Sequence, residues 1–204
     1  MALIKRKQRK NYYDIEYEAN YYNTRNAAWD FLIKNNVKTF PLDLQSIIKN
    51  NHWQLWSYKN YARVYGFSRQ DLIDISPDGF TDVDDKNNYR IVINEENSKF
   101  RCRFTVAHEI GHIVLHRTFR DSNKLEKEAN MFASRILMPM VLIKELKIES
   151  AQELSKLCDV SLQSAEIRLK RFEDIKGREK FYTTPLEIKL YKNLKQFIDK
   201  LNKK

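Results

Sequence analysis

The sequence predicts an α+β protein that is mainly helical, with a small and mostly antiparallel sheet before its central helix. Three observations support this fold class. Several long stretches repeat their apolar residues at the three- and four-residue spacing of an amphipathic helix. The region 53–94 instead shows the alternation and β-branched runs typical of strands. The chain has only four glycines and four prolines, which is typical of a folded protein without long linkers.

Length and composition limit the class of protein. A chain of 204 residues can bury a substantial core as one domain or two small ones. No apolar run reaches membrane-spanning length, and residues 1–7 lack the apolar core of a signal peptide, so we expect a cytoplasmic protein without a membrane partner. Two cysteines, Cys102 and Cys158, form no disulfide framework. The net charge of +10 allows a nucleic-acid or acidic partner, or only favours solubility.

The N-terminal third is expected to be helical. Residues 1–11 are predicted to form a basic arm, and 12–36 carries aromatic residues at helical spacing. A second helix is expected to begin at Pro41, because proline is favoured in a first turn, and to end near 50–51. His52 follows it, far in sequence from the other histidines, and we interpret it as a strand-edge residue rather than a ligand.

The next segments predict the sheet. Residues 53–58 alternate like a strand, 79–83 form a short strand after a turn, and 89–94 are the strongest strand because they are apolar and β-branched. Residues 61–70 fit either a short helix or a strand. An exposed edge of such a sheet could receive an extended peptide by strand addition.

A predicted helix over 104–117 carries the chemistry. His108 and His112 lie four residues apart, so on a helix they share one face and can reach one small cation. Glu109 follows the first histidine, which completes the His-Glu-x-x-His signature of zinc hydrolases. A catalytic zinc usually has three protein ligands and one water, so a third ligand must come from another residue.

His116 is the first candidate for that third ligand. It continues the face of His108 and His112, but on a straight helix it lies roughly 12 Å from His108 along the axis. Three nitrogens so placed cannot all reach one ion at about 2 Å. We therefore interpret His116 as a residue that supports the ligands, faces the substrate or is structural.

Two glutamates on the next predicted helix, 124–137, are the other candidates. Glu126 is favoured, because Asn130 follows it by one helical turn. The Asn130 side chain could accept the free N–H of one of the two histidines and fix its tautomer. Glu128 has no such partner in the sequence but stays open as the ligand.

Such a site would hydrolyse a peptide bond. Zinc lowers the pKa of a bound water from about 15.7 towards about 7 and polarises the scissile carbonyl. Glu109 would take the proton of that water as general base and pass it to the leaving amine. An oxyanion donor is also needed, and tyrosine or histidine side chains, His116 among them, could supply it.

The region 149–179 predicts a compact helical segment. Helices over 151–158 and 162–172, joined by a turn at 159–161, resemble a helix-turn-helix with Arg168 and Arg171 on its second helix. The same two-helix corner is also common as simple packing. The tail, 180–204, is predicted to contain one more helix and a basic end, so a DNA contact through the basic C-terminal region stays open.

The joint order of these motifs resembles the ImmA/IrrE family of zinc metallopeptidases. The resemblance covers about 53–172 and rests on the segments 91–94, 104–112, 126–133, 136–139 and 160–169. We expect a metallopeptidase domain over 12–148, and the resemblance implies that it holds a thermolysin-like zinc site in which His108, His112 and Glu126 are ligands and Glu109 is the base. It further implies a regulated cytoplasmic protease that cleaves a helix-turn-helix repressor and so releases phage, mobile-element or stress-response genes.

The alternative hypothesis is a regulator that binds DNA or protein and whose metal site is structural or vestigial. The basic residues around the two-helix segment motivate it, namely Lys170, Arg171, Lys176 and Arg178. A toxin-like partner of an antitoxin is a third option.

Overall fold

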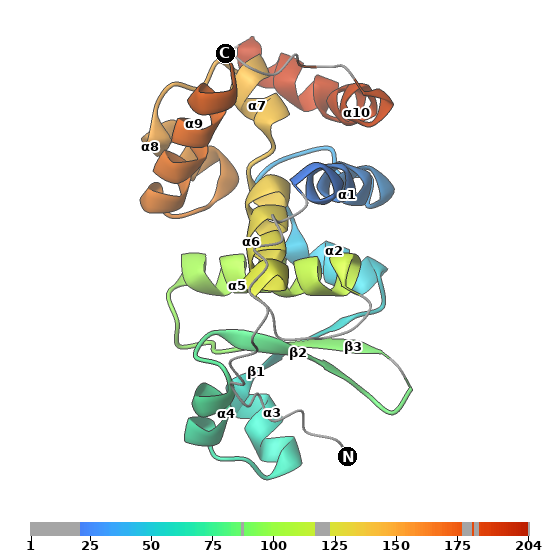
Figure 1. Cartoon of the computed structure of the whole chain (residues 1–204), viewed down its shortest axis with the longest axis vertical. Helices are drawn as coiled ribbons and strands as arrows, with labels where there is room; N and C mark the ends of the chain where they lie inside the picture. The colour runs from blue at the N-terminus through green and yellow to red at the C-terminus, as the bar shows by residue number, and fades with distance from the viewer. Residues whose placement is uncertain (1–20, 87, 117–122, 177–180, 182–183, 204) are drawn as a thin grey trace, which may run out of the picture.

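A three-stranded sheet lies between two layers of helices (Figure 1). The computed structural model describes residues 21–86, 88–116, 123–176, 181 and 184–203. The long helix α5 (Lys99–Leu115) crosses one face of the sheet, and α6 (Asn123–Leu137) packs on the side of α5 that faces away from the sheet. The prediction of a mainly helical α+β fold is confirmed. The predicted basic arm and the beginning of the helix expected over 12–36 lie outside the described residues.

The sheet is mixed, with strand order β1-β3-β2. Strands β2 (Gly79–Val83) and β3 (Tyr89–Ile93) form an antiparallel hairpin, whereas β1 (Gln54–Ser57) pairs with β3 in parallel. The prediction of a mostly antiparallel sheet is therefore wrong for one of its two strand pairs. The physical reason is the long connection through two helices and β2, which brings the chain back to start β3 at the same end as β1.

Two short helices cover the other face of the sheet. The ambiguous residues 61–70 span the end of α3 (Tyr58–Tyr65), a short turn that begins at Gly66 with a φ of 74°, and the start of α4 (Arg69–Ile75). Serine side chains cap both helices at their N-termini. A small second core forms where these helices meet β3, and its buried members are Tyr58, Tyr61, Leu72 and Val92.

The N-terminal helices are α1 (Tyr21–Lys34) and α2 (Leu44–Asn50). The expectation that α2 begins at Pro41 is wrong. The carboxylate of Asp43 accepts a hydrogen bond from the Ser46 amide at 3.0 Å, so the helix begins one residue after this cap. A capping side chain satisfies an otherwise unpaired N–H, and that local bond decides the start of the helix.

Helix α5 begins earlier than the sequence predicted, at Lys99 instead of 104, because the Ser98 hydroxyl caps it. It ends at Leu115 with His116 as its C-cap, and residues 117–122 lie outside the described part. Helices α5 and α6 approach closely at Gly111, where an added Cβ would lie 3.1 Å from Ala129 Cα. The small residues at this crossing bring the two helices that carry the predicted ligands together.

The remaining helices lie beyond the C-terminal end of α6 (Figure 1). They are α7 (Met140–Glu145), α8 (Ala151–Cys158), α9 (Leu162–Lys176) and α10 (Pro185–Asn202). The main apolar core runs without a break from α1 to α10, and residues such as Leu32, Phe132, Leu154 and Leu194 are completely buried in it. None of the helices in the described ranges is long and apolar enough to cross a membrane.

Candidate metal centre

The crossing of α5 and α6 brings three predicted ligands together. The Nε2 atoms of His108 and His112 lie 3.0 Å apart. Glu126 Oε2 lies 3.3 Å from His108 Nε2, and Glu126 Oε1 lies 3.4 Å from His112 Nε2. One ligand atom from each residue falls within a 4.8 Å cluster. Two imidazole nitrogens and a carboxylate oxygen at this spacing fit a divalent cation.

The charges of the group suit a cation as well. Contact with the His108 and His112 imidazoles holds the pKa of the Glu126 carboxyl well below its ordinary value. Burial lowers the pKa of His108, but the neighbouring carboxylates of Glu126 and Glu109 outweigh it, so this pKa lies above its ordinary value. The site therefore concentrates negative charge where a cation would sit.

A second layer of hydrogen bonds holds the histidines from behind. Asn130 Oδ1 lies 3.0 Å from His108 Nδ1, so the amide oxygen accepts the N–H that the sequence left to either histidine. His112 Nδ1 lies 3.1 Å from His116 Nδ1, and His116 Nε2 lies 3.2 Å from Glu128 Oε2. His116 is the C-cap residue of α5, and Glu128 contacts it. The three-residue cluster contains neither of them.

Glu109 lies on the sheet side of this centre and is buried. The Thr81 hydroxyl of β2 donates a 2.8 Å hydrogen bond to Glu109 Oε2. This contact depends on Gly79, where a Cβ would lie 2.7 Å from both Thr105 Cγ2 and the Val92 carbonyl. Glycine thus lets β2 lie close against α5.

Sequence reasoning missed two parts of the centre. Thr81 was read only as part of a strand, and the glycine two residues before it was the one signal of a close approach. The sequence also contained a weak indication of the contact between His116 and Glu128. A third histidine continues the face of the first two, and a second glutamate follows the first by two residues.

Comparison with known proteins decides the family. The family model described as the IrrE N-terminal-like domain, peptidase M78, matches residues 67–170, about half of the chain. The chain belongs to the IrrE N-terminal-like domain family. The match runs from α4 into α9 and includes the three clustered residues, Glu109 and Thr81. Membership supports a metallopeptidase type of function for this IrrE-like chain.

A phage protein is similar to this IrrE-like chain. It is "Uncharacterized immunity region protein 2" of Bacillus phage phi105, which is 30% identical over 118 residues. The similarity covers 51% of the present chain and 71% of the phage protein.

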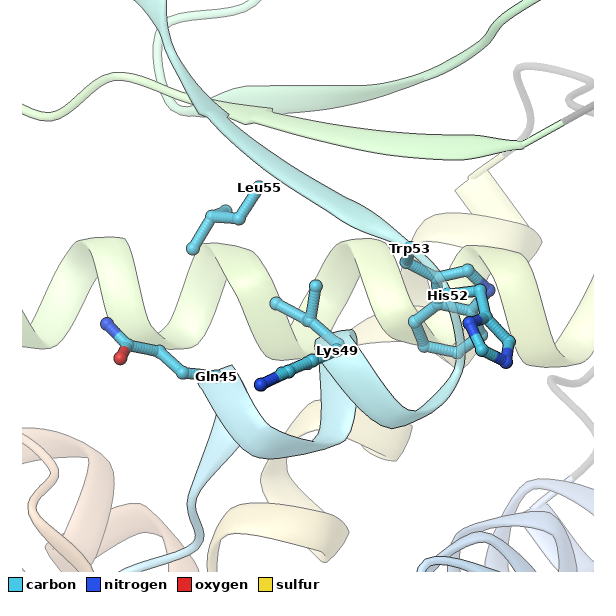
Figure 2. Close-up of a pocket in the computed structure, with 6 residues that line it drawn as sticks. Gln45, Lys49, His52, Trp53 and Leu55 are labelled. Atoms are coloured by element: carbon cyan, nitrogen blue, oxygen red, sulfur yellow. The ribbon is translucent and has the colours of Figure 1, made fainter.

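His52 takes no part in the centre of this IrrE-like domain. It lies in the turn before β1 and lines a shallow groove between α2 and β1 (Figure 2). Gln45 and Lys49 of α2 and Leu55 of β1 line the same groove. No residue of the metal cluster lines it, so the groove is separate from the candidate site.

The two-helix segment of the IrrE-like chain has its predicted turn at 159–161, with Asp159 in the left-handed conformation. Arg168 is buried, and its Nε donates to the Met138 carbonyl at 2.8 Å. It therefore packs the segment onto the end of α6 and is not available to DNA. The exposed side of α9 carries Glu166 and Ile167 beside Lys170.

Proposed function

We propose that this chain is a zinc-dependent endopeptidase that cleaves a helix-turn-helix transcriptional repressor. The observation that carries the proposal is the cluster of His108, His112 and Glu126 within 4.8 Å, next to the buried Glu109. Membership of a peptidase family supports it. A cytoplasmic location is part of the proposal, because a transcriptional repressor acts there.

The donor set favours zinc as the metal. Two imidazoles and one carboxylate are the protein ligands of many catalytic zinc sites, which leave a fourth position for solvent. His108 and His112 would hold the ion through Nε2, and Glu126 through its carboxylate. Bound zinc supplies Lewis acidity and a water of lowered pKa.

Glu109 is the residue that we assign to proton transfer. Its Oε2 accepts the hydrogen bond from Thr81, so Oε1 is the oxygen assigned to the proton of the attacking water. The same carboxylate then returns this proton to the amine that leaves as the peptide bond breaks. Because Thr81 holds one oxygen, the carboxylate keeps a fixed direction through both transfers.

Strand β2 is where we propose that the substrate binds. It is an edge strand in the order β1-β3-β2, and Thr81 in its middle contacts Glu109. An extended peptide could pair with its free edge and would then lie along the centre. This placement favours an endopeptidase that cuts within an extended segment.

The repressor as substrate is supported by resemblance. The sequence resembles ImmA/IrrE metallopeptidases, and this resemblance implies cleavage of a repressor. The phage phi105 relative carries the words "immunity region" in its name. We carry that setting over to this chain as a proposal.

The direct test mixes the purified chain, zinc and the helix-turn-helix protein encoded beside its gene. We expect fragments by mass spectrometry that disappear with Glu109→Gln and with a chelator. A repressor that stays intact with every divalent metal would contradict the proposed substrate. A fluorescence-quenched peptide library, run in parallel, shows whether a chain that leaves the repressor intact still cleaves other peptides. It therefore distinguishes a wrong substrate from the absence of peptidase activity.

The alternative function, a DNA-binding regulator, draws on one structural observation. Helix α10 exposes several lysines, among them Lys189, Lys192 and Lys200. A basic face of this kind can bind phosphates. A salt-dependent mobility shift on operator DNA that persists in Glu109→Gln would favour this function, and the absence of any shift at low salt would exclude it.

A further inference from the structure

Behind the metal cluster, three side chains form a continuous hydrogen-bonded row. His112 Nδ1 lies 3.1 Å from His116 Nδ1, and His116 Nε2 lies 3.2 Å from Glu128 Oε2. All three residues are buried, with 7–8% of their surface exposed. The row starts at a proposed ligand on α5, passes through the C-terminal cap of that helix, and ends on α6.

The chemistry of the row fixes where its protons lie. A carboxylate only accepts hydrogen bonds, so His116 Nε2 must donate to Glu128. A neutral imidazole has one N–H, so His116 Nδ1 is an acceptor and His112 Nδ1 must donate to it. The remaining nitrogen, His112 Nε2, then has a free lone pair. It is this atom that faces His108 and Glu126 in the cluster.

We propose that His116 and Glu128 are positioning residues that fix the tautomer and ring direction of His112, so that its Nε2 lone pair points at the metal. The proposal rests on the proposed metal site and deepens it. It also gives a role to His116 and Glu128, which are not ligands themselves.

The two proposed histidine ligands are held by different means. Asn130 on α6 holds His108 through a single amide oxygen. His112 lies one turn further along α5, and its link to α6 passes through the His116 ring to Glu128. Both links join α5 to the helix that carries Glu126. They therefore fix the ligands of one helix relative to the ligand of the other.

The test measures zinc affinity of the full chain by competition with a chromophoric chelator. Loss of a hydrogen-bonded partner behind a ligand typically weakens metal binding by about 10–100-fold. We expect this loss in Glu128→Leu and His116→Phe, which keep a similar volume without the polar atoms. Glu128→Gln keeps an oxygen that can accept from His116 and should stay within roughly threefold of the original affinity. Glu166→Leu, an exposed glutamate on α9, serves as the matched control.

A second readout makes the proposal independent of how well the variants fold. In the metal-free original chain, at a pH where the imidazole is neutral, nitrogen-resolved NMR should already show His112 protonated at Nδ1 and not at Nε2, because the hydrogen-bonded row fixes this tautomer before any metal binds. A His112 ring without a proton on Nδ1 would overturn the proposal, as would folded Glu128→Leu and His116→Phe variants that bind zinc as tightly as the original.

The proposed function can fail separately. A chain that binds zinc and shows the expected losses, but leaves the repressor intact, contradicts the substrate and keeps the positioning pair. A chain that cuts the repressor with unchanged zinc affinity in both variants contradicts only the positioning pair. Absence of zinc binding by the original chain overturns both.

Discussion

Thr81 and Glu109, which are 28 residues apart in the sequence, are joined by a hydrogen bond of 2.8 Å from the threonine hydroxyl to Oε2 of the glutamate. The bond connects the edge strand β2 to the helix that carries the metal cluster. It exists because Gly79 lets the strand lie against α5. The residue assigned to proton transfer is therefore held in place by the strand on which we propose that the substrate binds.

Replacing Thr81 by valine tests this relationship. Valine keeps the shape of threonine but cannot donate, and a hydrogen bond to a charged group contributes about 1.5–3 kcal/mol, so we expect the turnover rate to fall by about 10–100-fold. Zinc affinity should not change, because the Thr81 hydroxyl bonds to Glu109, which is not one of the three clustered residues. Thr81→Ser keeps the hydroxyl and should retain most of the rate. A Thr81→Val enzyme as fast as the original would contradict the assigned role.

Gly111 is predicted to be necessary for the approach of α5 to α6. A Cβ there would lie 3.1 Å from Ala129 Cα and 3.3 Å from Phe132 Cδ1. Gly111→Val should lower the free energy of unfolding by about 1–3 kcal/mol through overpacking, and should also weaken zinc binding because Glu126 moves with α6. Urea denaturation and chelator competition measure the two effects. Gly111→Ala should give a smaller change in the same direction, and equal stability of both variants with the original chain would show that the crossing can relax.

The pH dependence of zinc binding follows from His108. Since its pKa in the metal-free chain lies above the ordinary value of about 6.5, a proton occupies the site up to a higher pH than in a free histidine. Zinc must displace this proton, so zinc affinity should still rise with pH above the ordinary histidine pKa and should level off only above the raised pKa of His108. Calorimetry in buffers of different ionisation enthalpy should detect proton release near neutral pH. Affinity that stays constant between about pH 6 and 8 would contradict this expectation.

Arg168 is predicted to act in stability and not in nucleic-acid binding. Its buried side chain donates to the Met138 carbonyl, so Arg168→Ala removes packing and leaves a buried acceptor unpaired. We expect a loss of roughly 2–4 kcal/mol in the free energy of unfolding, measured by urea denaturation. The exposed Lys170 on the same helix is the control, and Lys170→Ala should stay within about 0.5 kcal/mol. Equal stability of the two variants would contradict the structural role.

The two thiols should differ in reactivity. Burial raises the pKa of the fully buried Cys158 to about 12, which leaves very little thiolate at neutral pH. The pKa of the partly buried Cys102 is raised as well, but its side chain can still be reached from solvent. Iodoacetamide should therefore modify Cys102 before Cys158 in the native chain, as peptide mapping would show, and should modify both at similar rates in guanidinium chloride. Similar rates in the native chain would show that α8 opens readily.

Local signals allowed much of the fold to be predicted. The strand over 79–83 and the helix over 151–158 have the predicted bounds. Where two local signals competed, sequence reasoning chose wrongly. Pro41 suggested a helix start, but the Asp43 cap sets it. The parallel pairing of β1 could not be read from the sequence, because residues far apart in the chain determine it.

The sequence by itself determined that His108, Glu109 and His112 lie together, because a spacing of one helical turn depends only on the backbone of one helix. The tertiary structure alone decided that Glu126 and not Glu128 faces both imidazoles, and that Asn130 meets His108. It also brought Thr81 to Glu109. These contacts depend on how closely α5 packs against α6 and β2, and that distance is set by glycines and buried side chains from separate parts of the chain.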